Sequence, residues 1–337
     1  IYILALVIGV YQIFHASINL VTYVLYRKNK IRPRFRFLLD GLVLVFLGGT
    51  SLLSSTGNSV FQLFVLGAYF CLYGVSNIRD GFLFEKEIGK NHLKRRVRMS
   101  LPIALAALIP ASTLAKINKF MQENADKEEE IYLGMVKFGK TADLEIFVHT
   151  AETSLFSAIG HVDLCYQGRV ISYGNYDPSS ETLFGMVGDG VLYFCDRDKY
   201  IDLCKRESQK TLFGYGIDLT PEMEEAVQEK LAELKQLTIP WEPSADKIKT
   251  EDGKEDYTYA YKIRHETDGE LYKFIKSKFK SYFVLSTNCV LLADTIVGQA
   301  GTDILSPKGF IAPGTYQAYL DREFEKPNSI VVSKHVY

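Results

Sequence analysis

Long apolar runs dominate the first third of the chain, whereas the rest alternates apolar and polar residues over short stretches. Four runs, at residues 1–25, 37–53, 60–75 and 99–114, are long enough or nearly long enough to cross a bilayer as helices. The core of a small soluble protein does not need four such helices in succession. The pattern therefore predicts a membrane domain of four transmembrane helices over residues 1–118.

Charged residues between the runs predict how the chain crosses the membrane. The loop at residues 27–36 and the stretch at residues 94–98 are rich in Lys and Arg, whereas the connection at residues 54–59 has no charge. Basic loops of this kind stay on the cytoplasmic side of a membrane. Four spans then place the C-terminal part of the chain outside the cytoplasm, and the loss of one span would reverse that side.

Polar and small residues inside the runs predict how the helices pack. Gln12, His15 and Asn19 recur every three or four residues, so they share one helix face that should turn inward. Residues 41–49 mix Gly with large apolar residues and, with the following spans, resemble HdeD-like small membrane proteins. We interpret these glycines as helix-packing positions. Charged residues are scarce inside the spans, which argues against a transporter or a channel.

Beyond a charged connector at residues 119–130, the chain has the pattern of a soluble α+β domain over residues 131–337. Period-2 alternation and turn residues predict an antiparallel sheet. The expected strands are residues 131–138, 144–149, 162–166, 169–173, 190–195, 211–219 and 257–263. Thr220 followed by Pro221 predicts the start of a helix, and further helices are expected at residues 271–279 and 316–322.

The string Thr287-Asn288-Cys289 carries the first candidate chemistry. A strand at residues 282–285 leads into it and an apolar helix follows, so Asn288 is expected to cap the helix and Cys289 to lie in its first turn. Backbone N–H groups and the helix dipole favour a thiolate there. The competing interpretation is a small buried residue of an apolar helix.

His161 is the candidate base that such a thiol needs. It begins a strand in which His161, Asp163 and Cys165 share one face, and the other face is apolar and should pack on the core. The His161 face would then be free to meet Cys289. Cys165 is a rival nucleophile, but it lacks activation by a helix start. A cysteine at a helix start with a histidine on a core strand is the arrangement of papain.

A third residue should orient the imidazole from the neighbouring strand. If Gln167 and Gly168 form a two-residue turn, the nearest polar neighbour is Ser172; if the loop is longer, Tyr173 and Asn175 move to that face. We favour Asn175 or Tyr173. His149 and His265 are alternative bases, without a surrounding motif.

The order of histidine before cysteine resembles the circularly permuted branch of the papain-like superfamily. That branch holds NlpC-like wall hydrolases and the lecithin–retinol acyltransferase group. The resemblance covers residues 144–297 and lies in Gly160-His161-Val162, Ser172-Tyr173-Gly174 and Asn288-Cys289. The acyltransferase group continues its Asn-Cys pair with Glu-His-Phe and has histidine near the position of Tyr173, so this chain departs from it.

The resemblance implies a membrane-anchored cysteine hydrolase or acyltransferase of the bacterial cell envelope that works through an acyl-enzyme without a cofactor. Its substrate would be a lipid, a lipoprotein or a peptidoglycan peptide, with the lipid bilayer as a partner. The net charge of −1 gives no reason to expect nucleic-acid binding. The alternative is a non-catalytic papain-like binding domain. A disulfide between Cys195 and Cys204 is permitted outside the cytoplasm, and two buried thiols fit equally well.

Overall fold

The computed structural model describes the chain in two compact units, residues 1–94 and residues 95–337. The described residues are 2–53, 60, 63–64, 67, 71, 74, 135–136, 142–149, 160–208, 212–249, 253, 255–298, 313–326 and 329–337. The expected connector at residues 119–130 and the expected fourth span at residues 99–114 lie outside this part, as does most of the third span at residues 60–75.

The first unit contains a pair of antiparallel helices, α1 (Tyr2–Lys28) and α2 (Phe35–Leu53). Both are long and apolar enough to cross a membrane. The described residues thus hold two candidate spans rather than the four expected, and the side of the membrane inferred from four spans loses its support.

Glycines allow α1 and α2 to approach each other closely. A Cβ atom on Gly41 would lie 2.9 Å from Leu20 Cδ2, and one on Gly48 would lie 2.9 Å from Ile13 Cδ1. The interpretation of these two glycines as helix-packing positions is therefore confirmed. Gln12 is fully buried, as expected for the polar face of α1.

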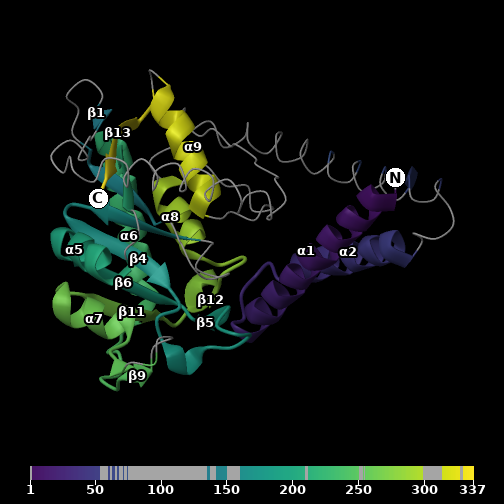
Figure 1. Ribbon diagram of the computed structural model, residues 1–337, viewed down its shortest axis with the longest axis horizontal. Coiled ribbons are helices and arrows are strands. Elements are labelled where there is room, and N and C mark those ends of the chain that lie inside the picture. Colours follow the sequence, from purple (N-terminus) through teal and green to yellow (C-terminus); the bar gives the residue numbers. More distant parts are fainter. Residues whose placement is uncertain are drawn as a thin grey trace. The chain divides into compact units, whose positions relative to one another are not determined.

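The second unit is built on a nine-stranded sheet (Figure 1), in which the hydrogen-bonded neighbours are antiparallel. The α+β class with an antiparallel sheet is therefore found. The strands in spatial order are β1 (Met135–Val136), β13 (Val331–Val336), β7 (Leu212–Ile217), β2 (Leu144–His149), β3 (His161–Tyr166), β4 (Arg169–Gly174), β6 (Val191–Asp196), β11 (Glu270–Phe274) and β8 (Thr238–Pro240).

The β3–β4 hairpin at the centre of the sheet has the two-residue turn that the sequence allows. Gln167 and Gly168 both have positive φ, at 50° and 73°, and Tyr166 pairs with Arg169. Positive φ at both central residues is typical of turns whose twist matches that of the strands. This register puts Ser172 on the same face as His161.

Helices cover both faces of the sheet (Figure 1). The helices α6 (Pro221–Gln236), α8 (Cys289–Val297) and α9 (Pro313–Glu325) contribute to one apolar cluster, and α5 (Arg197–Ser208) and α7 (Tyr259–Glu266) contribute to another. The face that carries Asp163 and Cys165 is thus buried, with exposures of 1% and 5%. This face was expected to be free to meet Cys289. His161, the first residue of β3, does interact with Cys289, but α5 and α7 cover the rest of the face.

Two segments have the opposite secondary structure to that expected. Residues 257–263 alternate tyrosine with other residues like a strand, but Thr258 caps α7 by accepting a hydrogen bond from the Tyr261 backbone N–H at 3.2 Å. Residues 271–279 were expected to form a helix, but Glu270–Phe274 forms β11 between β6 and β8. The second segment is a strand because β6 and β8 pair with it, and these partner strands cannot be identified from the local sequence.

Short elements complete the second unit. A separate two-stranded sheet pairs β5 (Val187–Asp189) with β12 (Ser281–Phe283), the strand that leads to Cys289. Another pairs β9 (Ile248–Lys249) with β10 (Glu255–Asp256). The 3-10 turns η3 (Pro178–Ser180) and η4 (Lys278–Lys280) precede β5 and β12.

A tight turn before β5 is conformationally strained. Leu183, Phe184 and Gly185 all have positive φ, and the Phe184 side chain is 93% exposed. We expect Phe184→Asn to raise the free energy of unfolding by about 1 kcal/mol, because asparagine adopts the left-handed conformation at lower cost. Denaturant melts of detergent-solubilised protein would measure this change. Ile275→Asn, at an exposed apolar position without positive φ, is the control, and a loss of stability in Phe184→Asn would contradict the argument.

Candidate functional site

The start of α8 presents Cys289 as the sequence predicts. The Leu291 backbone N–H donates to Asn288 Oδ1 at 3.1 Å, and Asn288 Nδ2 donates to the Val284 carbonyl at 3.0 Å. Asn288 is therefore the N-cap of α8, and Cys289 is its first residue. The Cys289 side chain is buried, with 3% exposure. The cap thus holds the thiol at the positive end of the helix dipole.

His161 lies beside Cys289 at the first position of β3. Its side chain keeps 25% exposure, so the imidazole borders solvent while Asp163 below it is buried. Burial lowers the pKa of His161, but the Asp163 carboxylate and then Cys289, by charge attraction and hydrogen bonding, raise it well above 6.5. A histidine in this setting holds a proton at neutral pH, which favours a neighbouring thiolate.

Asp163 provides the negative charge of the site. Its Oδ1 atom lies 2.8 Å from His161 Nε2, and its Oδ2 atom lies 2.7 Å from His149 Nε2. The contact at Oδ1 is an ion pair without aligned hydrogen-bond geometry. Burial raises the pKa of Asp163, but attraction to the close His161 imidazolium and the hydrogen bond from His149 outweigh it and lower the pKa far below its usual range.

Hydroxyl groups surround the same imidazole. Ser172 Oγ lies 2.9 Å and Tyr176 Oη 3.0 Å from His161 Nε2, and the two hydroxyls are 2.9 Å apart. Tyr282, on β12, interacts with Cys289; burial and then the Cys289 charge raise the pKa of its phenol well above 10. The neutral hydroxyls can donate hydrogen bonds to a developing charge near the thiol.

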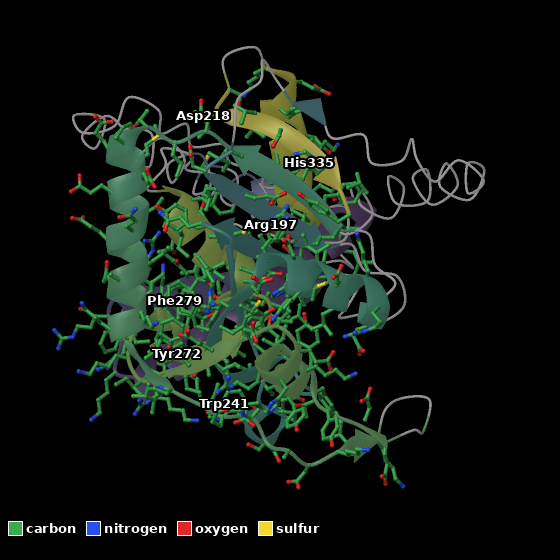
Figure 2. All side chains as sticks on the ribbon, turned by 90° about the vertical axis from the view of Figure 1, so that its left-hand side faces the viewer. Arg197, Asp218, Trp241, Tyr272, Phe279 and His335 are labelled. Carbon is green, nitrogen blue, oxygen red and sulfur yellow. The ribbon has the colours of Figure 1, made fainter. Side chains whose placement is uncertain are left out.

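The side chains favoured as the third residue have other partners. Tyr173 is fully buried and its hydroxyl donates to the Phe279 carbonyl at 2.9 Å; Phe279 is labelled in Figure 2. Asn175 Nδ2 donates to Glu181 Oε1 at 3.3 Å. Ser172, the alternative for a two-residue turn, does contact His161. We therefore replace Tyr173 and Asn175 with Asp163 as the candidate for the orienting residue.

The sequence did not predict that His149 and Tyr200 contact Asp163. His149 lies directly opposite His161 in the β2–β3 register. Tyr200, on α5, donates to Asp163 Oδ2 at 2.5 Å and lies 3.2 Å from His149 Nε2. The register of the two strands could have revealed His149, since cross-strand partners share a face. His265, the other alternative base, lies on α7 with its ring tilted against that of Tyr261, at a centroid distance of 4.2 Å.

The remaining soluble-domain cysteines are poor nucleophiles by comparison. Burial raises the pKa of Cys165 to about 12 and also raises that of Cys195. Cys195 and Cys204 are free thiols, so the disulfide considered from the sequence is not formed. None of these three begins a helix. The helix start and the neighbouring histidine therefore single out Cys289.

Comparisons with known proteins leave the site to be interpreted from its own geometry. No family model, curated protein or solved structure matches this chain. Among the residues that the structure describes, no group of three or more His, Cys, Asp and Glu side chains could hold a metal ion.

Proposed function

We propose that the C-terminal domain is a cysteine-dependent hydrolase or acyltransferase, with Cys289 as nucleophile and His161 as base. The observation that carries the proposal is a buried thiol at the start of α8 that interacts with a histidine whose charge is supported by Asp163. A thiol, a base and an orienting carboxylate together are the groups that acyl transfer requires.

The mechanism follows from these groups. His161 accepts the Cys289 proton, and the thiolate sulfur bonds to the carbonyl carbon of an amide, ester or thioester. Backbone N–H groups in the first turn of α8 stabilise the oxyanion that receives the carbonyl electrons. Collapse expels the amine, alcohol or thiol, which takes the proton from His161. Water or another acceptor, deprotonated by His161, then attacks the acyl-enzyme and releases Cys289.

The proposed substrate belongs to the bacterial cell envelope. Two N-terminal helices able to span a membrane support a location beside a bilayer, where lipids, lipoproteins and lipid-linked wall peptides are found. An extracytoplasmic domain is part of this proposal. The antiparallel sheet and the packing of α8 against β3 and β4 support the permuted papain-like architecture that the sequence resembles.

A non-catalytic binding domain is the second candidate. The observation that favours it is the 3% exposure of Cys289, because a nucleophile must reach its substrate. The two candidates differ in the reactivity that they require of the thiol, which can be measured without knowing the substrate.

Thiol labelling tests the proposal. In detergent-solubilised full-length protein at pH 7, iodoacetamide should modify Cys289 first, as read by peptide mass spectrometry. The rate should fall about tenfold or more in His161→Ala, because the imidazolium that stabilises the thiolate is lost. Cys165→Ala, which removes a buried thiol of β3, is the matched control and should leave the rate unchanged. Slow labelling of Cys289, or a rate insensitive to His161, would favour the binding domain.

A further inference from the structure

One buried carboxylate is shared by two histidines on neighbouring strands. Asp163 is 1% exposed, and each of its oxygens faces a different imidazole: Oδ1 is 2.8 Å from His161 and Oδ2 is 2.7 Å from His149. Tyr200 reaches Oδ2 from α5. The candidate mechanism uses only the Oδ1 side. The buried contacts of His149 and Tyr200 with Asp163 Oδ2 therefore have no role in that mechanism.

The contacts at Oδ2 fix the orientation of the carboxylate. A carboxyl group can rotate about its Cβ–Cγ bond, and the partners of Oδ2 oppose that rotation together with the ion pair at Oδ1. His149 and Tyr200 approach Oδ2 from β2 and α5, so neither moves with Asp163 itself. Without the His149 donor, Oδ2 would lose a buried hydrogen-bond partner, and the carboxylate would turn toward other donors.

We propose that His149 is a positioning residue of the site, which donates its Nε2 proton to Asp163 Oδ2 and thereby holds Oδ1 toward His161. The inference rests on the proposed function of Cys289 and His161. Tyr200 is a second anchor of the same oxygen. The proton belongs on His149 Nε2 because the atom facing it is a carboxylate oxygen, which only accepts hydrogen bonds.

The consequence for His161 is a change in its charge at neutral pH. The raised pKa of His161 depends on Asp163, so a rotated carboxylate lowers it toward the ordinary value. Fewer imidazolium ions then stabilise the Cys289 thiolate near pH 6.5. At pH 9 the higher hydroxide concentration favours thiolates in general, so the alkylation rate should depend less on the imidazolium. Several titratable groups face Asp163 and His161. They are His149 from β2, Tyr200 from α5, Cys289 from α8, Tyr259 from α7, Tyr193 from β6, Tyr282 from β12 and Tyr176.

The test is the pH profile of Cys289 alkylation by iodoacetamide in the full-length protein. His149→Phe keeps a ring but no donor, and should slow alkylation about tenfold at pH 6.5 and less than about twofold at pH 9. His149→Gln restores one N–H donor without a titratable group, and should match the wild type at both pH values. His265→Phe changes an exposed histidine on α7 that contacts Tyr261, so it is the matched control and should behave as wild type.

The outcomes separate this inference from the proposed function. A wild-type rate insensitive to His161→Ala means that the proposed function fails. A wild-type rate that depends on His161, with His149→Phe unchanged at pH 6.5, overturns the positioning role alone. Equal losses at pH 6.5 and pH 9 would show general damage and also overturn it. If His149→Phe does not fold, a tenfold loss at pH 6.5 in His149→Gln would still contradict the inference.

Discussion

Asp163→Asn should slow the acylation of Cys289 by about a thousandfold, because a neutral amide cannot hold the His161 imidazolium. The amide nitrogen would also place a donor where His161 and His149 now face an acceptor, which favours the wrong tautomer of each ring. The measurement is the second-order rate of acylation by p-nitrophenyl acetate at pH 7, in detergent-solubilised full-length protein. This small ester serves as an acyl donor that assumes nothing about the natural substrate.

An exposed carboxylate provides the matched control for this substitution. Asp268 pairs with Lys199 at 2.5 Å, and its side chain is 68% exposed, so Asp268→Asn should leave acylation unchanged. Circular dichroism of Asp163→Asn would show whether the fold persists. A folded Asp163→Asn protein that acylates within tenfold of the wild type would remove Asp163 from the mechanism.

Local sequence signals predicted the parts of the site that depend on few neighbouring residues. The turn at Gln167 and Gly168 follows from glycine and its two flanking strands, and the cap at Asn288 follows from a polar residue before an apolar helix. The first strand of the hairpin begins at His161, as the shared face of His161, Asp163 and Cys165 predicts. Turns, caps and strand alternation are short-range properties, which explains this agreement.

The partners of Asp163 depend on long-range contacts, which local sequence signals do not give. His149 is 14 residues away along the chain and Tyr200 is 37 residues away, so their contacts depend on strand order and on which helix covers the sheet. The α5 helix itself was not expected, because its charged sequence has few apolar residues in a helical pattern. The sequence therefore did not indicate that a helix covers the face of β3 that carries Asp163, and Asp163 is buried in the structure.

Arg197 links three distant parts of the second unit, and Figure 2 labels it where α5 begins. Its guanidinium donates to Glu145 Oε2 from Nε at 3.1 Å and from Nη2 at 2.9 Å, and also reaches the Tyr337 hydroxyl at 2.6 Å. The cation lies 5.7 Å from the ring centroid of Phe147. Glu145 is on β2, the strand that ends at His149, and α5 carries Tyr200, so this cluster joins the two elements that contact Asp163 Oδ2.

Arg197→Leu should lower the free energy of unfolding by about 2 kcal/mol, because Glu145 would keep its charge without a cation. We place the loss at the low end for a buried pair, since the two side chains are 29% and 12% exposed. Denaturant melts in detergent would measure it. Arg206→Leu, which breaks an exposed pair with Glu266, is the control and should change stability by less than about 0.5 kcal/mol. Because Arg197 anchors the start of α5, alkylation of Cys289 at pH 6.5 should also slow in Arg197→Leu. Equal free energies of unfolding for Arg197→Leu and Arg206→Leu would contradict a structural role for the cluster.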